Sequence, residues 1–399
     1  MKKLRWLVVL AAMLFATAAN ADGIDVKVKG TWDFVFGWAT NQSDGFHGGR
    51  YDTRADDNFI ARQRVRTQIN FITSEYLQGV LMFEIGMTEW GRDGGSKNGP
   101  ASGGGLDADG VNVKTKRAFL DWLIPNTEVS VRMGIQGVSL PMANGYCNPV
   151  FSADVAGIVV NSPITDMFGV TAFWLRPFNQ NLNDGVTAGR ANHLDDEMDI
   201  FGLTLPITGD GWSVTPWGMY AINGNASGYY EYITTYWGAG DYYIGRASDN
   251  DSANAWWLGL SAQIDIWDPL TFGFDFMYGR MGKANVGIYD MGSDPAFRRW
   301  DNVDAGTKGW FFEAALNYKL DWGTPGIFGW YASGDDKDDV RDGWFGRMPV
   351  VGVDDGFTPT SFGFSGSYSG ISSNGAITYT GMGTWGIGLQ IADMSFIQD

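Results

Sequence analysis

The segment from Phe59 to Ile72, FIARQRVRTQINFI, restricts the possible folds of this chain more than any other. Apolar and polar side chains alternate along it, which is the period of an extended strand with two different faces. One face carries Arg62, Arg64 and Arg66, and these charges need water because burying an unpaired charge is very costly. The other face needs hydrocarbon or a protein core. A transmembrane β-barrel around an aqueous lumen meets both needs, and so does a soluble sandwich with a basic surface.

The N-terminus has the three parts of a secretory signal peptide. A basic start is followed by an apolar run from Leu7 to Phe15 and by Ala19-Asn20-Ala21, a small-x-small cleavage site. We therefore predict a signal peptide over residues 1–21, a mature chain from Asp22, and export. Beyond it there is no run of about 18 apolar residues, so the sequence predicts no transmembrane helix.

Charge and residue types argue against several functions. Without the signal peptide the chain has 25 basic and 45 acidic side chains, a net charge of −20, which argues against a nucleic-acid partner. The single cysteine, Cys147, excludes an intramolecular disulfide. His47 and His193, the two histidines, lie in no catalytic motif, and a hydrolase needs a nucleophile with a partnered base. We expect no enzyme activity, no cofactor and no metal site.

The alternation of Phe59–Ile72 recurs along the whole chain. Clear copies lie at 24–38, 77–88, 115–124, 129–136, 256–266, 272–278, 310–318 and 385–391. Further strands are expected at 157–163, 168–176, 198–205, 212–222 and 326–333, where both phases hold small or apolar residues. The sequence thus predicts an all-β, antiparallel fold of about fourteen strands without helices.

The connections between these segments alternate in length. Brief turns such as 73–76, 125–127, 267–269 and 321–325 alternate with long polar loops near 39–56, 91–112, 137–156, 177–197, 223–253, 282–307 and 334–380. Short turns on one rim and long loops on the other are typical of outer-membrane barrels. Aromatic residues also gather at strand ends, at Trp38, Tyr76, Trp90, Trp122, Trp174, Trp267 and Trp322. They fit two interfacial girdles, although aromatic residues also favour strands in general.

Several segments together resemble a known family. These are the signal peptide LVVLAAMLFA, the mature start DGIDVKVKGTWDF, the segment NFIARQRVRTQINF, the loop GIQGVSLP, and the late stretches GFTPTSFGF and GTWGIGLQIADMSF. They resemble the outer membrane homotrimeric porins of sulfate-reducing bacteria. The resemblance implies a trimer of water-filled barrels for passive diffusion of small hydrophilic solutes and ions. The expected partners are further copies of the chain, outer-membrane lipid and lipopolysaccharide.

The C-terminus departs from this family. Members of the family continue with further strands, whereas this chain stops at Met394-Ser-Phe-Ile-Gln-Asp399. Because a barrel edge is not left open to lipid, either fourteen strands close among themselves or a final hairpin is missing. We expect a sixteen-stranded design that lacks its C-terminal hairpin.

The polar phases of the early strands predict the pore wall. The candidate pore-lining and constriction residues are Arg62, Arg64, Arg66, Glu84, Arg117, Asp121, Arg132, Gln136 and Asp154. Asp154 belongs to the loop 137–156, which we expect to fold inward and narrow the pore. Walls of charge set the selectivity of channels, so five arginines against few acids predict a basic constriction. The alternative is an ordinary solvated wall whose charges are paired and passive.

Other interpretations remain open at this stage. The acidic clusters 335–339 and 195–197 provide the oxygen ligands that calcium prefers, but their spacing matches no known calcium loop, which favours solvated surface. A non-conducting structural or adhesive barrel and a soluble β-rich lectin are the alternatives to a porin. Conductance and behaviour in detergent extracts separate these classes.

Overall fold

The described part of the chain consists of β-strands. The computed structural model describes residues 24–39, 58–91, 104, 113–143, 147–179, 197–224, 238–239, 242–247, 253–290, 301–334, 342–353 and 384–392. The predicted signal peptide, 1–21, lies outside them. Within the described residues, no helix is long and apolar enough to cross a membrane. The chain divides into two compact units, Met1–Gln136 and Gly137–Asp399.

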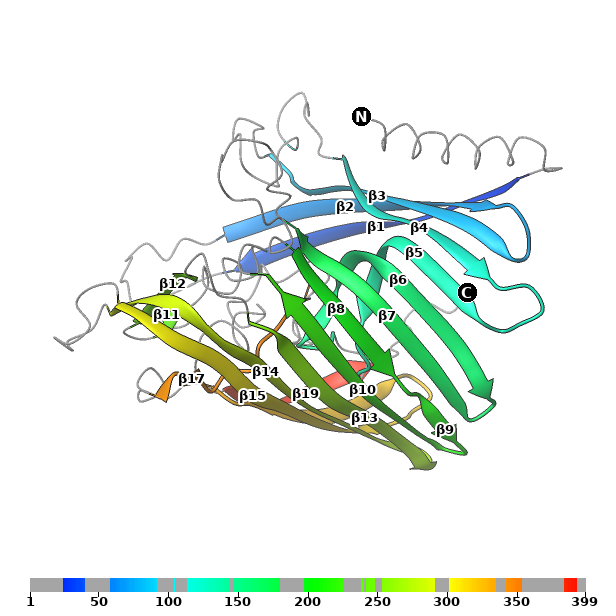
Figure 1. The fold of residues 1–399 in the computed structure, drawn as a ribbon. Helices are drawn as coiled ribbons and strands as arrows, with labels where there is room; N and C mark the ends of the chain where they lie inside the picture. Colours follow the sequence, from blue (N-terminus) through cyan, green and yellow to red (C-terminus); the bar gives the residue numbers. More distant parts are fainter. Residues whose placement is uncertain are drawn as a thin grey trace, which may run out of the picture. The chain divides into compact units, whose positions relative to one another are not determined.

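The first unit is an antiparallel meander in which each strand pairs with the next (Figure 1). Its strands are β1 (Asp25–Ala39), β2 (Asn58–Ile72), β3 (Leu77–Glu89), β4 (Val113–Leu123) and the first part of β5 (Ser130–Ser139). Tight turns join β2 to β3 and β4 to β5. In the first turn, for example, the Thr73 N–H donates to the Leu77 carbonyl at 3.0 Å.

The two faces of this first sheet differ in chemistry. One face is apolar and exposed, with Trp32 71% and Val28 66% accessible. The other carries charged and amide side chains on each of its strands, and we call it the polar face; its members are Asp33, Arg64, Arg66, Gln68, Asn70, Gln78, Glu84, Asp121, Arg132 and Gln136. In a soluble sandwich the apolar face would be the buried one. Here large apolar side chains are left on the outside, as they are in a sheet that faces hydrocarbon.

The second unit is a longer antiparallel meander (Figure 1). Its main strands are β6 (Phe151–Thr165), β7 (Phe168–Asn179), β8 (Glu197–Thr204), β10 (Trp212–Asn223), β13 (Ala255–Trp267), β14 (Leu270–Asp290), β15 (Asp301–Tyr318), β16 (Thr324–Ala332) and β19 (Thr384–Ala392). Shorter pieces are β9 (Ile207–Gly209), β11 (Gly238–Ala239), β12 (Tyr242–Ala247), β17 (Trp344–Phe345) and β18 (Gly352–Val353).

One face of this second sheet is a packed apolar core. Trp257, Met277 and Phe311 are fully buried on neighbouring strands and belong to one cluster. Two segments that leave the meander, 140–150 (of which 144–146 lie outside the described residues) and 342–351, supply further members of the same cluster: Leu140, Val150, Phe345, Met348 and Val351. We call these two segments the inward segments.

The opposite face of the second sheet is apolar and exposed, with aromatic residues toward both strand ends. Near the long loops lie Tyr220, Trp256, Tyr278, Trp310 and Tyr331, which we call the loop-side aromatic row. Near the short turns lie Trp212, Trp267, Tyr318 and Trp322, which we call the turn-side aromatic row. The rings of Trp310 and Tyr331 stack with centroids 5.0 Å apart. Between the rows on β15 this face carries Phe312, Ala314 and Leu316, so an apolar band separates the two aromatic rows.

The predicted all-β, antiparallel class is confirmed, and each strand segment predicted from the sequence overlaps an observed strand. Several boundaries were wrong. The predicted loop 137–156 is shorter, because β5 runs to Ser139 and β6 begins at Phe151. Part of the predicted loop 282–307 is strand, since β14 and β15 stay paired as far as Ile288 and Asp301. Backbone pairing continues there after the apolar alternation has ended, and this alternation was the signal used to place the boundaries.

Candidate functional site

Three ion pairs cross the polar face of the first sheet. The shortest donor–acceptor distances are 3.1 Å for Arg64 Nε to Asp33 Oδ2, 2.7 Å for Arg66 Nε to Glu84 Oε2, and 2.7 Å for Arg132 Nη2 to Asp121 Oδ2. The members of each pair stand directly opposite each other on neighbouring strands. Strand register therefore creates these pairs, because directly opposed residues on one face have side chains within reach.

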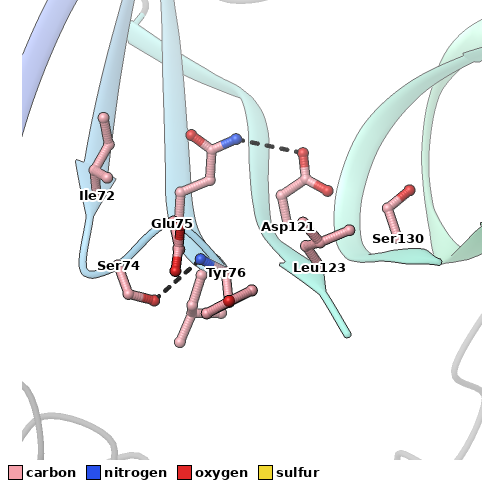
Figure 2. A pocket seen from close by; sticks show the side chains of 9 residues that line it. Ile72, Ser74, Glu75, Tyr76, Asp121, Leu123 and Ser130 are labelled. Atoms are coloured by element: carbon pink, nitrogen blue, oxygen red, sulfur yellow. Dashed lines mark hydrogen bonds between the residues drawn. The ribbon is translucent and has the colours of Figure 1, made fainter. Parts of the chain in front are cut away.

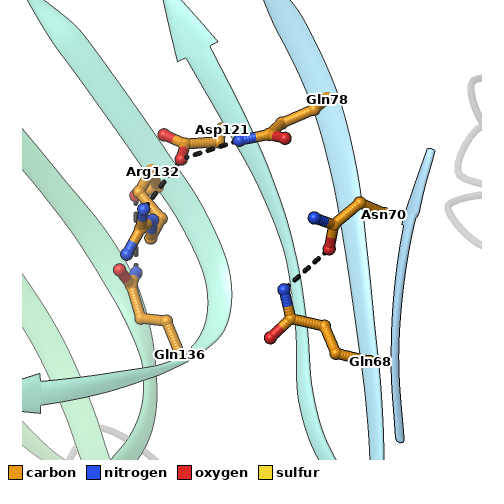
Figure 3. A network of polar contacts seen from close by, with 6 residues as sticks. All are labelled: Gln68, Asn70, Gln78, Asp121, Arg132 and Gln136. Carbon is orange, nitrogen blue, oxygen red and sulfur yellow. Dashed lines mark hydrogen bonds and ion pairs between the residues drawn. The ribbon is translucent and has the colours of Figure 1, made fainter. Parts of the chain in front are cut away.

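Amide side chains extend this charged ladder (Figure 3). Gln78 Nε2 donates to the Asp121 carboxylate at 3.4 Å, so this acid bridges β3 and β5. Gln136 Nε2 donates to the backbone carbonyl of Arg132 at 3.4 Å. On β2, Gln68 Nε2 donates to Asn70 Oδ1 at 2.7 Å. The polar face thus carries several hydrogen-bonded pairs and one longer network around Asp121, rather than a row of isolated arginines.

The pairing reduces the excess of positive charge on this face. Arg64 is buried, with a side chain only 9% accessible, while the side chains of Arg66 and Glu84 are 23% and 12% accessible. Two opposite charges about 3 Å apart act on a more distant ion as a dipole, whose field falls faster with distance than that of a single charge. The charge count on the strands therefore overstates how basic this wall is. These three arginines are each paired with an acid on a neighbouring strand, which is one part of the alternative interpretation.

A shallow pocket of about 310 Å³ lies where the polar face meets the short turns (Figure 2). It is lined by Glu75 and Tyr76 from the first turn and by Gln78, Asp121 and Ser130 from the strands β3, β4 and β5. A hydrogen bond between Tyr76 and the Glu75 carboxylate raises the pKa of the Tyr76 hydroxyl above its ordinary value. Tyr76 is therefore neutral at neutral pH, and carboxylates are the charged groups among the lining residues.

The structure places most of the predicted pore residues on the first sheet, whereas Asp154 belongs to the second unit. Arg117 is half-buried on β4, four residues from Asp121 and hence on the same face. The Arg62 side chain lies outside the described residues; its backbone pairs with Val35 and Glu89. Asp154 lies in strand β6 of the second unit, next to the buried Val155, so alternation directs it to the face opposite the core.

Asp33 was not among the predicted site residues, although it pairs with Arg64. It does lie on the polar phase of its strand, but that phase alone gives no partner. A second group, on β7 and β8, was also missed. Arg176 there binds Asp199 through two hydrogen bonds of 2.8 and 2.7 Å, and Glu197 lies at 3.4 Å. The register between strands decides which side chains form such pairs, and this register could not be predicted from the sequence.

The inward segments are fixed to the second sheet by polar contacts as well as by the core. The backbone N–H of Ala143 donates to both oxygens of the fully buried Asp275 on β14, at 3.1 and 3.0 Å. Trp257 Nε1 donates to the Pro349 carbonyl at 2.7 Å. The two segments also contact each other, through the Val351 N–H and the Val150 carbonyl at 2.9 Å. They form one joint structure on the inner side of β13 to β15.

The Asn148 side chain links the two ends of the 140–150 segment by hydrogen bonds. Its Oδ1 accepts hydrogen bonds from the Val150 and Phe151 N–H groups at 2.9 and 3.4 Å, and its Nδ2 donates to the Pro141 carbonyl at 3.0 Å. Asn148 is fully buried. Within the described ranges no group of three or more His, Cys, Asp or Glu side chains is arranged to hold a metal ion.

Solved structures to which this chain is similar are outer-membrane proteins. A structure of OmpF from Salmonella typhi in complex with daunomycin aligns with 79% of this chain and 81% of its own, at 13% identity and a TM-score of 0.44. A porin structure refined at 1.8 Å aligns with 77% and 84%, at 12% identity and a TM-score of 0.39. OmpT, an outer membrane protein of Vibrio cholerae, aligns with 83% and 92%, at 10% identity and a TM-score of 0.33. No family model and no curated protein matches the chain.

Proposed function

We propose that this protein is an outer-membrane porin, a β-barrel that lets small hydrophilic solutes and ions diffuse through a water-filled channel. One observation carries the proposal: large apolar side chains are exposed on one face of each sheet, while the first sheet keeps its charges on the other face. Lipid outside and water inside require this arrangement. Water outside and a dry core inside require the reverse.

The distance between the two aromatic rows fits a membrane. On β15, Trp310 and Tyr318 are eight residues apart, which is about 26 Å along the strand and, with the strand tilt of about 40° in such barrels, about 20 Å along the membrane normal. The outward apolar band of outer-membrane barrels is about 25 Å tall and is flanked by aromatic girdles. We infer that the two rows lie at the two interfaces of the bilayer, with the long loops outside the cell.

The ion-paired polar face is proposed as the wall that ions pass, and the inward segments as the structures that narrow the channel. In this proposal Arg62, Arg64, Arg66, Glu84, Arg117, Asp121, Arg132 and Gln136 line the pore. The expected constriction loop corresponds to residues 140–150 and acts together with 342–351. A basic constriction is retained as part of the proposal, weakened by the acid that each of Arg64, Arg66 and Arg132 contacts. Homotrimer formation and contact with lipopolysaccharide are proposed from the sequence resemblance.

Cell fractionation tests the proposed location. We expect the mature protein in the outer-membrane fraction with Asp22 as its first residue, because the leader carries a signal-peptide pattern. N-terminal sequencing of the purified protein measures this. Recovery from the soluble periplasm, or a retained leader, would contradict the proposal.

The Arg66–Glu84 pair gives a signed test of the pore wall. One unbalanced charge acts on an ion about 7 Å away in water with about 0.6 kcal/mol, which is a factor of two to three in permeability ratio. Arg66→Gln leaves Glu84 unbalanced and should shift the zero-current potential under a salt gradient toward cations. Glu84→Gln should shift it toward anions by a similar amount, and the double variant should return near wild type.

Arg176→Gln is the control for this cycle. Arg176 follows the buried Leu175 on β7, so its side chain points to the face opposite the core. Its loss should therefore leave the potential unchanged. Equal shifts from Arg66→Gln and Arg176→Gln would mean that the polar face does not line the conducting path.

A non-conducting structural or adhesive barrel is the second candidate. The apolar packing of the inward segments against the second sheet favours it, because it removes wet space on that side. Planar-bilayer recordings of the purified protein decide between the two: stepwise conductance supports the porin, and stable insertion without conductance supports the structural barrel.

A further inference from the structure

Three cations surround one tryptophan at the loop end of the second sheet. Above the ring of Trp344, Arg280 Cζ lies 4.5 Å, Lys308 Nζ 5.2 Å and Lys283 Nζ 5.4 Å from the centroid. Trp344 belongs to β17, which extends the edge of β15 by pairing Gly306 with Trp344 (Figure 1). We call these four residues the basic rim cluster.

The cluster lies on the outward face of the sheet. Arg280 and Lys308 are register partners on β14 and β15, and both are exposed. Their chain neighbours Met281 and Thr307 are buried on the core side. Because successive side chains of a strand point to opposite faces, Arg280 and Lys308 point away from the core and from the proposed channel.

Its height relative to the membrane follows from the register. Arg280 and Lys308 stand two residues beyond Tyr278 and Trp310, which belong to the loop-side aromatic row. Two residues of strand correspond to about 7 Å. Aromatic belts lie at the level of the lipid headgroups, so the cluster stands where the outermost charged part of a headgroup lies.

Two described acids, Asp304 and Asp342, flank the cluster along the chain, but neither forms a salt bridge with it. The contacts of Lys283 are the Trp344 ring and the Asp342 backbone carbonyl, at 3.2 Å from Nζ, and no described carboxylate forms a salt bridge with Arg280, Lys283 or Lys308. The outward Arg176 on β7, by contrast, is neutralised by Asp199 and Glu197. Three like charges repel one another, and cation–π contacts offset only part of that repulsion at exposed sites. An anion held among them would remove the rest.

We propose that the basic rim cluster binds the phosphate group of a lipid in the outer leaflet. The inference rests on the proposed membrane location. Phosphate is the anion of lipid headgroups that Lys and Arg bind best, and basic residues at a membrane surface attract such headgroups. The flat Trp344 ring keeps the three cations around one point, and the exposed apolar band below them contacts the acyl chains.

The test compares binding of phosphorylated and dephosphorylated lipid A. Full-length protein is reconstituted into phosphatidylcholine vesicles that contain a minor fraction of fluorescent lipid A, and energy transfer from tryptophan reports local enrichment. The variants are the triple substitution Arg280→Gln/Lys283→Gln/Lys308→Gln and the single Lys308→Gln. Lys319→Gln is the matched control, because Lys319 is an exposed lysine directly after the opposite end of β15.

At about fivefold in affinity for each cation removed, Lys308→Gln should lose about fivefold and the triple variant about a hundredfold. Lys319→Gln should bind lipid A like the wild type. The triple variant should show no further loss of enrichment when dephosphorylated lipid A replaces the phosphorylated lipid. Inorganic phosphate should not compete with the lipid. Unchanged enrichment in the triple variant would overturn the proposal. So would competition by inorganic phosphate, which would indicate a soluble anion as the ligand.

Channel recordings on the same preparations separate the two proposals. A triple variant that conducts like wild type but has lost lipid enrichment supports the inference. A conducting wild type without enrichment overturns the inference alone, and a wild type that does not insert into bilayers overturns the proposed function.

Discussion

Leu260→Arg should prevent assembly of the protein in a membrane. Leu260 lies exposed on the outward face of β13, in register between Pro216 and Phe276, and between the two aromatic rows. Arginine at the midplane of a barrel surface costs about 2–4 kcal/mol, and each 1.4 kcal/mol changes the folded-to-unfolded ratio about tenfold. The folded fraction in detergent micelles or vesicles, followed by heat-modifiable gel mobility over a urea series, measures the effect.

Gln68→Arg provides the control for this substitution. Gln68 lies on the polar face beside Asn70 and near arginines that are already accommodated there, so a further arginine should lower the folded yield little. Equal losses from Leu260→Arg and Gln68→Arg would show that the two faces have been assigned to the wrong solvents, and would favour a soluble β-rich protein.

Asn148→Ala should release the 140–150 segment and widen the channel. The substitution removes the side-chain partners of the Val150 and Phe151 N–H groups and of the Pro141 carbonyl. Leaving a buried polar group without a partner costs about 1–3 kcal/mol. The loss of these bonds should therefore destabilise the packed position of a short segment enough to release it. Single-channel conductance should rise and limited proteolysis within 140–150 should accelerate.

Asn161→Ala is the matched control for Asn148→Ala. Asn161 lies in β6, the strand that follows the segment, but is exposed, and it accepts one hydrogen bond, from Thr171 Oγ1 at 3.0 Å. Its loss should change neither conductance nor proteolysis. If Asn148→Ala left the conductance at the wild-type value while proteolysis increased, the inward segments would be structural and would not narrow the path of ions.

In the first sheet, the amino-acid pattern was sufficient to predict the strands and to separate their faces. Arg64 and Arg66 alternate with Val65 and Thr67 at the two-residue period of a strand, because the two faces meet chemically different surroundings. The partners of these arginines were not predictable. Asp33 is 31 residues before Arg64, and only the register of β1 on β2 decides that these two side chains meet.

In parts of the second sheet, the sequence predicted strands but did not distinguish their faces. Ala221 and Ile222 on β10 are both apolar neighbours, yet Ala221 is fully buried and Ile222 is 52% exposed. The sequence determined that both faces of β10 carry apolar residues. Tertiary structure decided which one is covered, because the inward segments 140–150 and 342–351 return from distant parts of the chain to the apolar cluster that contains Ala221. Apolar and polar residues alternate where a strand separates two different surroundings. Where protein covers one face and an apolar surrounding is proposed for the other, both faces are apolar and the sequence shows no alternation.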